Sequence, residues 1–513
     1  MKNIISYFLL SVLFLTTSCS DWLDIQSKSE ERESNMFETY NGFKEALAGC
    51  YTSMASRTLY GEKLMFTDID VLARLYVAPK VGSKPALYYL HNHNYTAEES
   101  RNEFSAIFGA LYNVIAEANT IITHIDTEGS VIKSTQARNV INAEAHAIRA
   151  FCHFDVLRLF GQMPQNAEKT VSLPYAEYTS ITDMPVYYDF DAFVGKLEND
   201  LNLAESLLQA SDPILEYTYA QLDGDDTSVS IPEDDFMCYR RERFNLWAVK
   251  ALKARFYMYL GNKERAYQYA KEVINATING KPVIELSGLS DLSDHIIATN
   301  KNIGKWYALP SECLFALNNS KLDDYATSIL GGDPSFNIDT NNQLYVSTYM
   351  LNSQLYRGVS TASENRYLYT WEKTTTNGST TYPTLKKYYR SQTNSVDLRT
   401  LRTKYQIMPL IRLSEMYLIA MESTSDLAEA NALYKIYMES HNVNITTDFA
   451  SLSAVDTEVL NEYRREFYGE GEIFYTYKRH ATPTILFGSA MGENEYIIPL
   501  PDAEFDSNKE VEH

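Results

Sequence analysis

The sequence predicts a mainly α protein in which a helical scaffold carries one long, irregular, loop-rich insertion. Apolar residues recur at steps of three and four in many segments of the 513-residue chain, which is typical of packed helices. This periodicity breaks over residues 282–404, where Ser, Thr, Asn, Gly and Tyr are frequent. No Pro- or Gly-rich linker divides residues 36–513. We therefore expect one body with its scaffold in 36–281 and 405–513 and a ligand lobe in between.

The stretch RNVINAEAHAIRAFCHFDVLRLFGQMP, residues 138–164, predicts the central helix. It is apolar on two neighbouring helical faces. A surface helix is apolar on one face only, so this helix must lie between others. Gly161, followed by Pro164, is typical of a helix end. We therefore expect a core helix that ends near Gly161.

The same periodicity predicts further helices on both sides of the central one. They cover residues 39–55, 104–125, 190–208, 244–260, 263–275, 411–422, 427–440 and 455–468. The pair 244–260 and 263–275 resembles a tetratricopeptide unit, two antiparallel helices with small residues at their crossing. Such pairs bury both faces only by stacking on neighbours, which predicts a tetratricopeptide-like scaffold. Within the insertion, Glu312–Leu317 and Leu344–Tyr349 are candidate strands.

The first residues have the layout of a secretory signal. Lys2 supplies the positive start, residues 4–15 form an apolar run, and three small residues precede Cys19. The run is shorter than the roughly 20 residues that a membrane span needs. We predict a signal peptide at residues 1–18, either of a lipoprotein with Cys19 as the lipidated residue or of an ordinary secreted protein. Residues 19–35, rich in Ser and Glu, predict a flexible tether.

Charge and cysteine usage narrow the classes of partner. The chain has 67 Asp and Glu against 45 Lys and Arg, a net charge of −22. This balance argues against nucleic acid and against an anionic membrane surface as partners. The other four cysteines form no CxxC motif and no Cys/His cluster, so we predict no metal site and no cofactor.

Five stretches resemble motifs of the SusD/RagB family and occur in the expected order. They are residues 111–119, then Glu144 and Arg149 with the ending Phe160–Pro164, and then residues 408–422, 462–479 and 496–508. The resemblance implies a SusD-like fold and a surface lipoprotein that helps Bacteroidota import glycans or peptides. Leu15–Cys19 also resembles a bacterial lipobox, and Ser20–Asp24 resembles the acidic leader of surface-exported lipoproteins.

The resemblance further implies an anchor and a partner. Cys19 would carry several acyl chains, which together hold a protein stably at a membrane. The protein would face the exterior of the outer membrane and dock on a SusC-like TonB-dependent transporter. Glu472, Ile473 and Thr476 depart from the family pattern, which leaves the cargo open between oligosaccharide and peptide.

Tyrosine is unusually frequent, with 39 Tyr against 22 Phe. Its ring offers a flat apolar face and a polar tip, on which a sugar ring can stack. Residues 68–95 and the insertion combine such rings with Asn, Asp and Arg. In the insertion the aromatic residues are Trp306, Tyr307, Tyr345, Tyr349, Tyr356, Tyr367, Tyr369 and Trp371. We expect ligand contacts from Trp306, Trp371, Tyr369, Tyr88, Tyr89 and Asn92; the alternative for each is packing between helices.

Charged motifs in the chain have more than one interpretation, and none predicts catalysis. Arg464–Glu470 could hold a catalytic carboxylate pair, but its helical spacing favours an ion-pair network that ties a helix to a turn. Residues 223–226 and 233–235 could bind calcium, but they lack the spacing of an EF-hand and favour solvated loops. His91 and His93 have no third ligand nearby in sequence. We predict a glycan-binding protein that is not an enzyme; a peptide binder and a helical scaffold without ligand are the alternatives.

Overall fold

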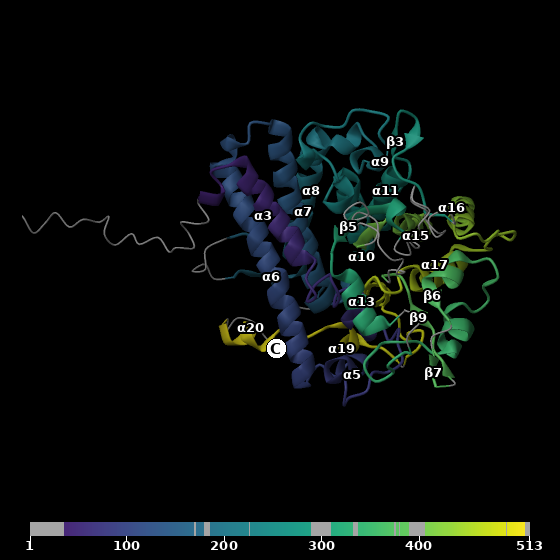
Figure 1. The fold of residues 1–513 in the computed structure, drawn as a ribbon. Helices are drawn as coiled ribbons and strands as arrows, with labels where there is room; N and C mark the ends of the chain where they lie inside the picture. Colours follow the sequence, from purple (N-terminus) through teal and green to yellow (C-terminus); the bar gives the residue numbers. More distant parts are fainter. Residues whose placement is uncertain are drawn as a thin grey trace, which may run out of the picture.

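The computed structural model describes residues 35–168, 171–178, 185–224, 226–288, 309–331, 337–373, 376–378, 380–388, 406–488 and 490–507. Figure 1 shows helices packed against one another with short strands between them, as the predicted mainly α fold requires. The helices are α3 (Tyr40–Met54), α4 (Asp68–Leu72), α5 (Pro85–His91), α6 (Glu98–Thr127), α7 (Thr135–Phe160), α8 (Phe190–Ser211), α9 (Tyr219–Leu222), α10 (Leu246–Tyr259), α11 (Lys263–Ile274), α13 (Leu322–Leu330), α15 (Leu413–Ser423), α16 (Leu427–Ser440), α17 (Leu452–Glu466), α18 (Ile473–Arg479), α19 (Glu493–Tyr496) and α20 (Asp502–Ser507). The strands are β1 (Leu173–Pro174), β2 (Tyr187–Tyr188), β3 (Thr277–Ile278), β4 (Lys281–Pro282), β5 (Cys313–Asn318), β6 (Trp371–Glu372), β7 (Thr376–Asn377), β8 (Thr380–Thr381), β9 (Thr384–Leu385) and β10 (Ile407–Arg412).

Helix α7 is the core helix that its two apolar faces predict. Every side chain from Ala143 to Phe160 is buried, with α6, α8, α3 and α10 packed around it. At its start, the side chain of Ser134 accepts a hydrogen bond from the N–H of Ala137. At its end, a Cβ on Gly161 would lie only 2.5 Å from the carbonyl oxygen of Leu157. Glycine is therefore needed where the chain leaves the helix.

Antiparallel helix pairs extend the body away from α7. Helices α10 and α11 are joined through Gly261, whose φ of +75° lies in the left-handed region that glycine adopts without strain. Helix α11 packs on α15, and α15 packs on both α16 and α17. Each pair thus buries its second face on the next one, which confirms the predicted tetratricopeptide-like scaffold.

One antiparallel pair of six-residue strands, β5 and β10, runs through the core with nearly all its side chains buried. The strand predicted at Glu312–Leu317 is confirmed with a displacement of one residue. The helix predicted at 411–422 begins instead at Leu413, because the residues before it belong to β10. A short apolar run suits a buried strand as well as a helix, so periodicity alone could not place this boundary.

The second predicted strand, Leu344–Tyr349, is wrong. The N–H groups of its first and third residues donate to the carbonyl oxygens of Ile329 and Pro383, at 2.6 and 3.3 Å. Because these donors go to two different segments, the stretch cannot form a ladder with one neighbouring strand. It leads instead into a π-helical turn at Met350–Leu355. The division of the chain at residues 282 and 404 into scaffold and lobe stays a prediction.

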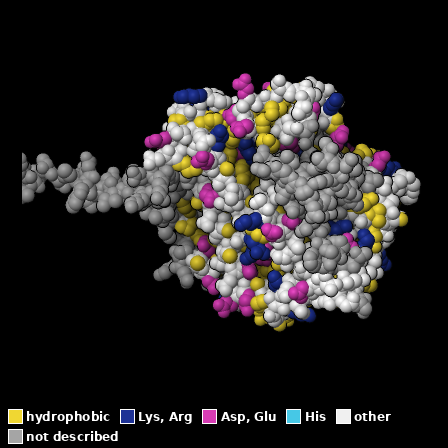
Figure 2. Space-filling view, viewed as in Figure 1, with side chains coloured by type: hydrophobic (Ala, Val, Ile, Leu, Met, Phe, Trp, Pro, Cys, Tyr) yellow, Lys and Arg dark blue, Asp and Glu magenta, His cyan; other side chains and the backbone are white. Residues whose placement is uncertain are grey.

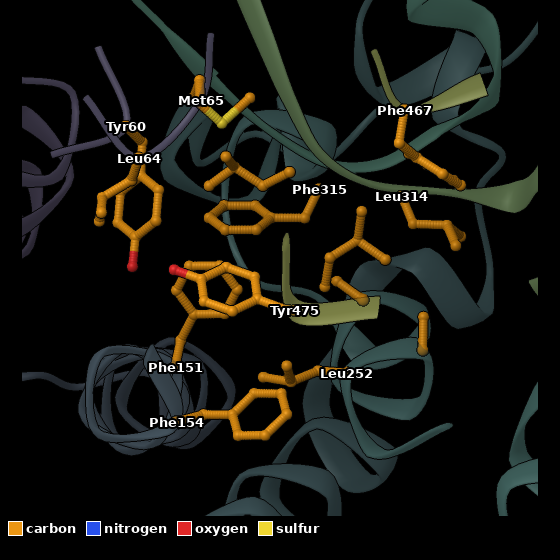
Figure 3. Close-up of a cluster of buried hydrophobic side chains, with 14 of the residues drawn as sticks. Tyr60, Leu64, Met65, Phe151, Phe154, Leu252, Leu314, Phe315, Phe467 and Tyr475 are labelled. Carbon is orange, nitrogen blue, oxygen red and sulfur yellow. The ribbon is translucent and has the colours of Figure 1, made fainter. Parts of the chain in front are cut away.

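Aromatic side chains join α7 to the strand pair and to the N-terminal segment (Figure 3). Phe151 of α7 packs edge-on against Phe315 of β5 at a ring separation of 6.0 Å, and its ring lies 5.3 Å from that of Tyr60. The Tyr60 hydroxyl donates to Asp155 at 2.6 Å, so this buried polar tip is satisfied. Segments far apart in the sequence therefore share one core.

Helix α6 is the one helix in the described ranges whose length and composition would suffice to cross a membrane. It packs along α7 and α3, and 44% of its most apolar window is buried inside the protein. Its apolar side chains thus pack against α7 and α3, as those of a core helix do.

Candidate functional site

Two segments that the sequence singles out for ligand contact touch each other in the structure. Residues 75–92, which we call the excursion, follow α4 and include α5. Residues 337–349, which we call the lobe loop, precede the π-helical turn. The N–H of Val77 donates to the carbonyl oxygen of Tyr345 at 2.9 Å. The structure therefore joins two stretches that are more than 240 residues apart in the sequence.

Tyrosines lie on both segments and are partly open to solvent. Tyr345 packs edge-on against Tyr382 with ring centroids 4.9 Å apart, and Tyr88 packs in the same way against Tyr89 at 5.4 Å. These four side chains are half-buried, whereas Tyr349 exposes 64% of its surface. Edge-on contacts hold the rings in place without hiding them from solvent, as stacking on a sugar ring requires.

Amide and carboxylate groups lie on the same two segments. Asn92, at the end of α5, is exposed, and its side-chain amide donates to the carbonyl oxygen of Tyr88 at 2.8 Å. In the lobe loop, the carboxylate of Asp339 accepts from the N–H of Asn341 at 3.0 Å and from the Asn342 amide at 2.6 Å. Groups of this kind can exchange hydrogen bonds with sugar hydroxyls in place of water.

Trp371 does not form the exposed platform that the sequence predicts. Its side chain is only 2% exposed and packs edge-on against Tyr468 with centroids 4.8 Å apart. It belongs to β6, where its backbone pairs with Leu385 of β9. The prediction of exposure is wrong because this strand turns the indole into the core.

The other predicted contact residues have different outcomes. Tyr88, Tyr89 and Asn92 reach solvent, and their role in binding stays a prediction. Tyr369 is half-buried and packs against Leu309. Trp306, Tyr307 and Cys19 lie outside the described residues. Of the insertion's other tyrosines, Tyr356 is buried, whereas Tyr367 is half-buried and its hydroxyl donates to Asn352 at 3.0 Å in an exposed hydrogen bond.

Tyr382 is the residue of this region that the sequence analysis did not single out. It lies in the short stretch between β8 and β9, and its ring packs against that of Tyr345. Its neighbour Pro383 accepts the hydrogen bond from Val346. The local sequence Thr-Tyr-Pro-Thr marks a turn but gives no sign of a partner 37 residues away.

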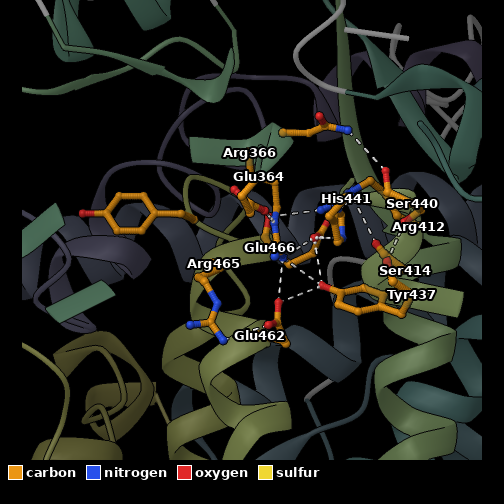
Figure 4. Close-up of polar contacts among 12 residues, drawn as sticks. Glu364, Arg366, Arg412, Ser414, Tyr437, Ser440, His441, Glu462, Arg465 and Glu466 are labelled. Atoms are coloured by element: carbon orange, nitrogen blue, oxygen red, sulfur yellow. Dashed lines mark hydrogen bonds and ion pairs between the residues drawn. The ribbon is translucent and has the colours of Figure 1, made fainter. Parts of the chain in front are cut away.

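The Arg464–Glu470 stretch forms a buried ion-pair network, as its helical spacing favours (Figure 4). Glu466 pairs with Arg412 at 2.5 Å and with Arg366 at 2.9 Å, and Glu470 pairs with Arg412 at 2.8 Å. All these groups are nearly inaccessible to solvent. The Arg412 guanidinium holds the pKa of Glu466 well below its ordinary value, although burial opposes the shift. This network joins α17 to the strand β10 and to the turn that follows α17.

Two of the candidate calcium residues are engaged in protein contacts. Asp223 pairs with Arg241 at 2.9 Å, and Asp234 accepts a hydrogen bond from Tyr40 at 2.6 Å. Burial lowers the pKa of His91 to about 4, so its ring is neutral at pH 7. No group of three His, Cys, Asp or Glu side chains suited to a metal ion occurs within the described ranges. On the face shown in Figure 2, acidic side chains are spread among basic ones.

A cleft of about 470 Å³ lies between α3, the end of β5 and residues 236–243. Arg243 lines it, with its guanidinium 3.8 Å above the ring of Phe236. The same guanidinium pairs with the buried Glu144 at 2.5 Å. The charge of Arg243 and one face of the Phe236 ring are therefore used within the protein. This makes the cleft a weaker candidate for ligand binding than the tyrosine-bearing segments.

Comparison with protein families gives two matches. The profile described as "Starch-binding associating with outer membrane" matches residues 21–258, and the profile of the SusD family matches residues 246–512. Among curated proteins, SusD-like protein P25 of Formosa agariphila is 22% identical over 278 residues, 54% of this chain and 46% of that protein. SusD-like protein P2 of the same organism is 28% identical over 154 residues, 30% of this chain and 29% of that protein. The alignments thus span less than half of either curated relative.

Solved structures share the fold over almost their whole length. A SusD superfamily protein of Bacteroides thetaiotaomicron superposes with a TM-score of 0.67 at 20% identity, covering 92% of this chain and 99% of that one. Surface glycan-binding protein A of Bacteroides fluxus gives 0.64 at 18% identity, and a laminarin-binding SusD-like protein gives 0.63 at 18%. Each of the latter two covers 92% of this chain and 98% of its own. These likenesses concern the fold.

Proposed function

This chain belongs to the SusD family, and on that premise we propose that it captures oligosaccharides at the cell surface and delivers them to a SusC-like TonB-dependent outer-membrane transporter. It binds its cargo without cleaving it. Acyl chains on Cys19 anchor it in the outer membrane, facing the exterior. Residues 19–35 form the tether between this anchor and the SusD-like body, residues 36–513.

The contact between the excursion and the lobe loop is the observation that supports glycan capture. It brings together two segments that carry partly exposed tyrosines and exposed amide groups. Aromatic rings recognise the C–H face of a sugar, and amides recognise its hydroxyls. A helical scaffold without a ligand would have no need of such a surface.

The names of related proteins favour a carbohydrate over a peptide. One structural neighbour is called laminarin-binding and another a surface glycan-binding protein. One common mode of peptide recognition uses the backbone donors and acceptors of an exposed strand edge. The excursion presents the short helix α5 instead, with the side chains of Tyr88 and Tyr89.

Glycan capture can be tested with the soluble chain from residue 20 onward. We expect it to bind one or more members of an oligosaccharide array that includes maltoheptaose and laminarihexaose. Mixed peptides printed on the same array should give no signal, and the mass of each bound glycan should stay unchanged on incubation. Binding to peptides alone would contradict the proposal, and a loss of glycan mass would reveal an enzyme.

Delivery requires a partner, because a lipid anchor provides no passage through the membrane. A permanent complex with a transporter should bury more than about 2,000 Å². Tagged protein purified from detergent-solubilised outer membrane should therefore bring down a TonB-dependent transporter in near-equal amount. Recovery of the lipoprotein alone, under conditions that preserve other such pairs, would contradict delivery and leave a free-standing surface binder.

A further inference from the structure

The excursion is closed at its base by two side chains that cross between its ends. Nε of Arg74, just before the excursion, donates to the carbonyl oxygen of His91 at 2.8 Å. Nε2 of His93, just after it, donates to the carbonyl oxygen of Leu72, also at 2.8 Å. A carbonyl oxygen can only accept, so this histidine nitrogen carries the proton. We call Arg74 and His93 the neck clamp.

Both clamp residues have a strained backbone. Arg74 has a φ of 55° and His93 a φ of 51°, in the left-handed region that residues other than glycine rarely adopt. Each such residue costs about 1 kcal/mol or more, and it persists only where its surroundings fix it. Arg74 stands just before the excursion and His93 just after it. The backbone here is therefore held in a defined path on both sides.

The residues just inside the neck are firmly seated, whereas the tip of the excursion is not. Leu75 and Tyr76 are buried, and the Tyr76 hydroxyl donates to the carbonyl oxygen of Phe66 at 3.0 Å. Farther out, residues 81–83 are exposed, and Val81 exposes 49% of its surface. Helix α5 buries Leu87 and Leu90 against the core and packs on α4 and α6, and attachments at the ends of the excursion add to this packing in fixing its position.

Those attachments are the neck clamp and two hydrogen bonds to the lobe loop. Besides the bond from Val77 to Tyr345, the ammonium of Lys80 donates to the Asn341 side chain at 2.5 Å. Both of these lie before α5 in the sequence, and the Lys80 bond is exposed to competing water. The two clamp bonds hold the returning end, where His91 and His93 follow the tyrosines of α5.

We propose that Arg74 and His93 are positioning residues that fix α5, and with it Tyr88 and Tyr89, for the capture of oligosaccharide. This inference rests on the proposed function. A helix of seven residues has little stability of its own. Without the clamp, the ends of α5 would be less ordered in the free protein, and the affinity would fall by the cost of ordering them on binding. The clamp residues themselves need not touch the ligand.

Hydrogen exchange on the soluble mature chain tests the clamp without any ligand. In Arg74→Met and in His93→Leu, we expect amides of α5 to exchange about tenfold faster or more, while those of the buried α7 keep their protection. His93→Gln retains a side-chain N–H donor and should restore slow exchange. Arg101→Met removes a 51% exposed arginine that pairs loosely with Asp502, and it serves as the charge-matched control.

Titration of the same variants with maltoheptaose and laminarihexaose tests the consequence for binding. We expect the dissociation constant for whichever of the two binds the unaltered protein to rise about tenfold in Arg74→Met and His93→Leu, and to recover in His93→Gln. Unchanged exchange in α5 when both substitutions are combined would overturn the clamp. Faster exchange with unchanged affinity would overturn the positioning role and leave the proposed function intact. If no oligosaccharide of the array binds the unaltered protein, the proposed function is contradicted, and hydrogen exchange still decides whether the clamp exists.

Discussion

His153 makes the stability of this protein sensitive to mild acid. Its side chain on α7 is fully buried and stacks on Tyr175 with ring centroids 3.8 Å apart. Its Nδ1–H donates to the carbonyl oxygen of Arg149 at 2.9 Å, and its Nε2 accepts from the N–H of Ala176 at 3.0 Å. The donor on Ala176 requires an unprotonated Nε2, so the folded state holds this histidine neutral.

Burial lowers the pKa of His153 from 6.5 to about 3. Between these values the unfolded chain binds a proton that the folded chain does not, so acid favours unfolding. The stabilising contribution is complete above pH 6.5 and is lost at about 1.4 kcal/mol per pH unit below it. From pH 7.5 to 5.0 the loss amounts to about 2 kcal/mol.

The test compares the unaltered protein with His153→Gln in urea unfolding followed by circular dichroism. The glutamine side chain of the variant cannot titrate, so the difference in free energy of unfolding between the two proteins should shrink by about 2 kcal/mol from pH 7.5 to 5.0. Taking this difference removes the contributions of the other histidines. Between pH 7.5 and 8.5 it should stay constant, which is the internal control. A difference that also stays constant down to pH 5.0 would refute the reasoning.

Three further predictions concern the ion-pair network, a glycine and the anchor. Arg412→Met should lower the free energy of unfolding by about 3–5 kcal/mol, because buried carboxylates lose their shared partner; an equal loss in Arg464→Met, whose hydrogen-bond partners are neutral, would contradict this. Gly471→Ala should reduce folding yield and melting temperature, since φ is +72° and a Cβ would lie 1.9 Å from the carbonyl oxygen of Leu64; unchanged melting would contradict this. Cys19→Ala should abolish incorporation of radiolabelled fatty acid, and persisting label would disprove the lipidation site.

Sequence periodicity was sufficient to predict the helical scaffold, because the pattern of each helix lies within its own residues. The two apolar faces of α7 predict a sandwiched helix, and α10 and α11 are recognisable from their own residues. The start of α15 was missed because β10 precedes it directly. The apolar residues of β10 suit either structure, and only the partner strand β5, about 90 residues earlier, makes them a strand.

The candidate site could be predicted from the sequence only in part. The two candidate ligand segments could be recognised from their Tyr, Asn and Asp content, yet nothing local predicts that Val77 bonds to Tyr345. The sequence also did not predict which aromatic side chains are exposed to solvent. Trp371 and Tyr349 lie in similar aromatic surroundings in the sequence, but one is 2% exposed and the other 64%. Strand pairing and tertiary packing decide which aromatic ring faces solvent, and neither can be read from composition.

Calorimetric titration of a tyrosine variant tests the central claim, glycan capture where the excursion meets the lobe loop. The double variant Tyr345→Ala/Tyr382→Ala removes one of the two edge-on pairs, and Tyr267→Ala removes a half-buried tyrosine from α11 as the matched control. Aromatic contacts at the centre of a binding surface contribute about 1–3 kcal/mol, so the double variant should bind an array-positive oligosaccharide at least about tenfold more weakly. The control should bind it like the unaltered protein. Equal affinity in all three proteins, with folding intact, would contradict the assignment of the ligand to this surface.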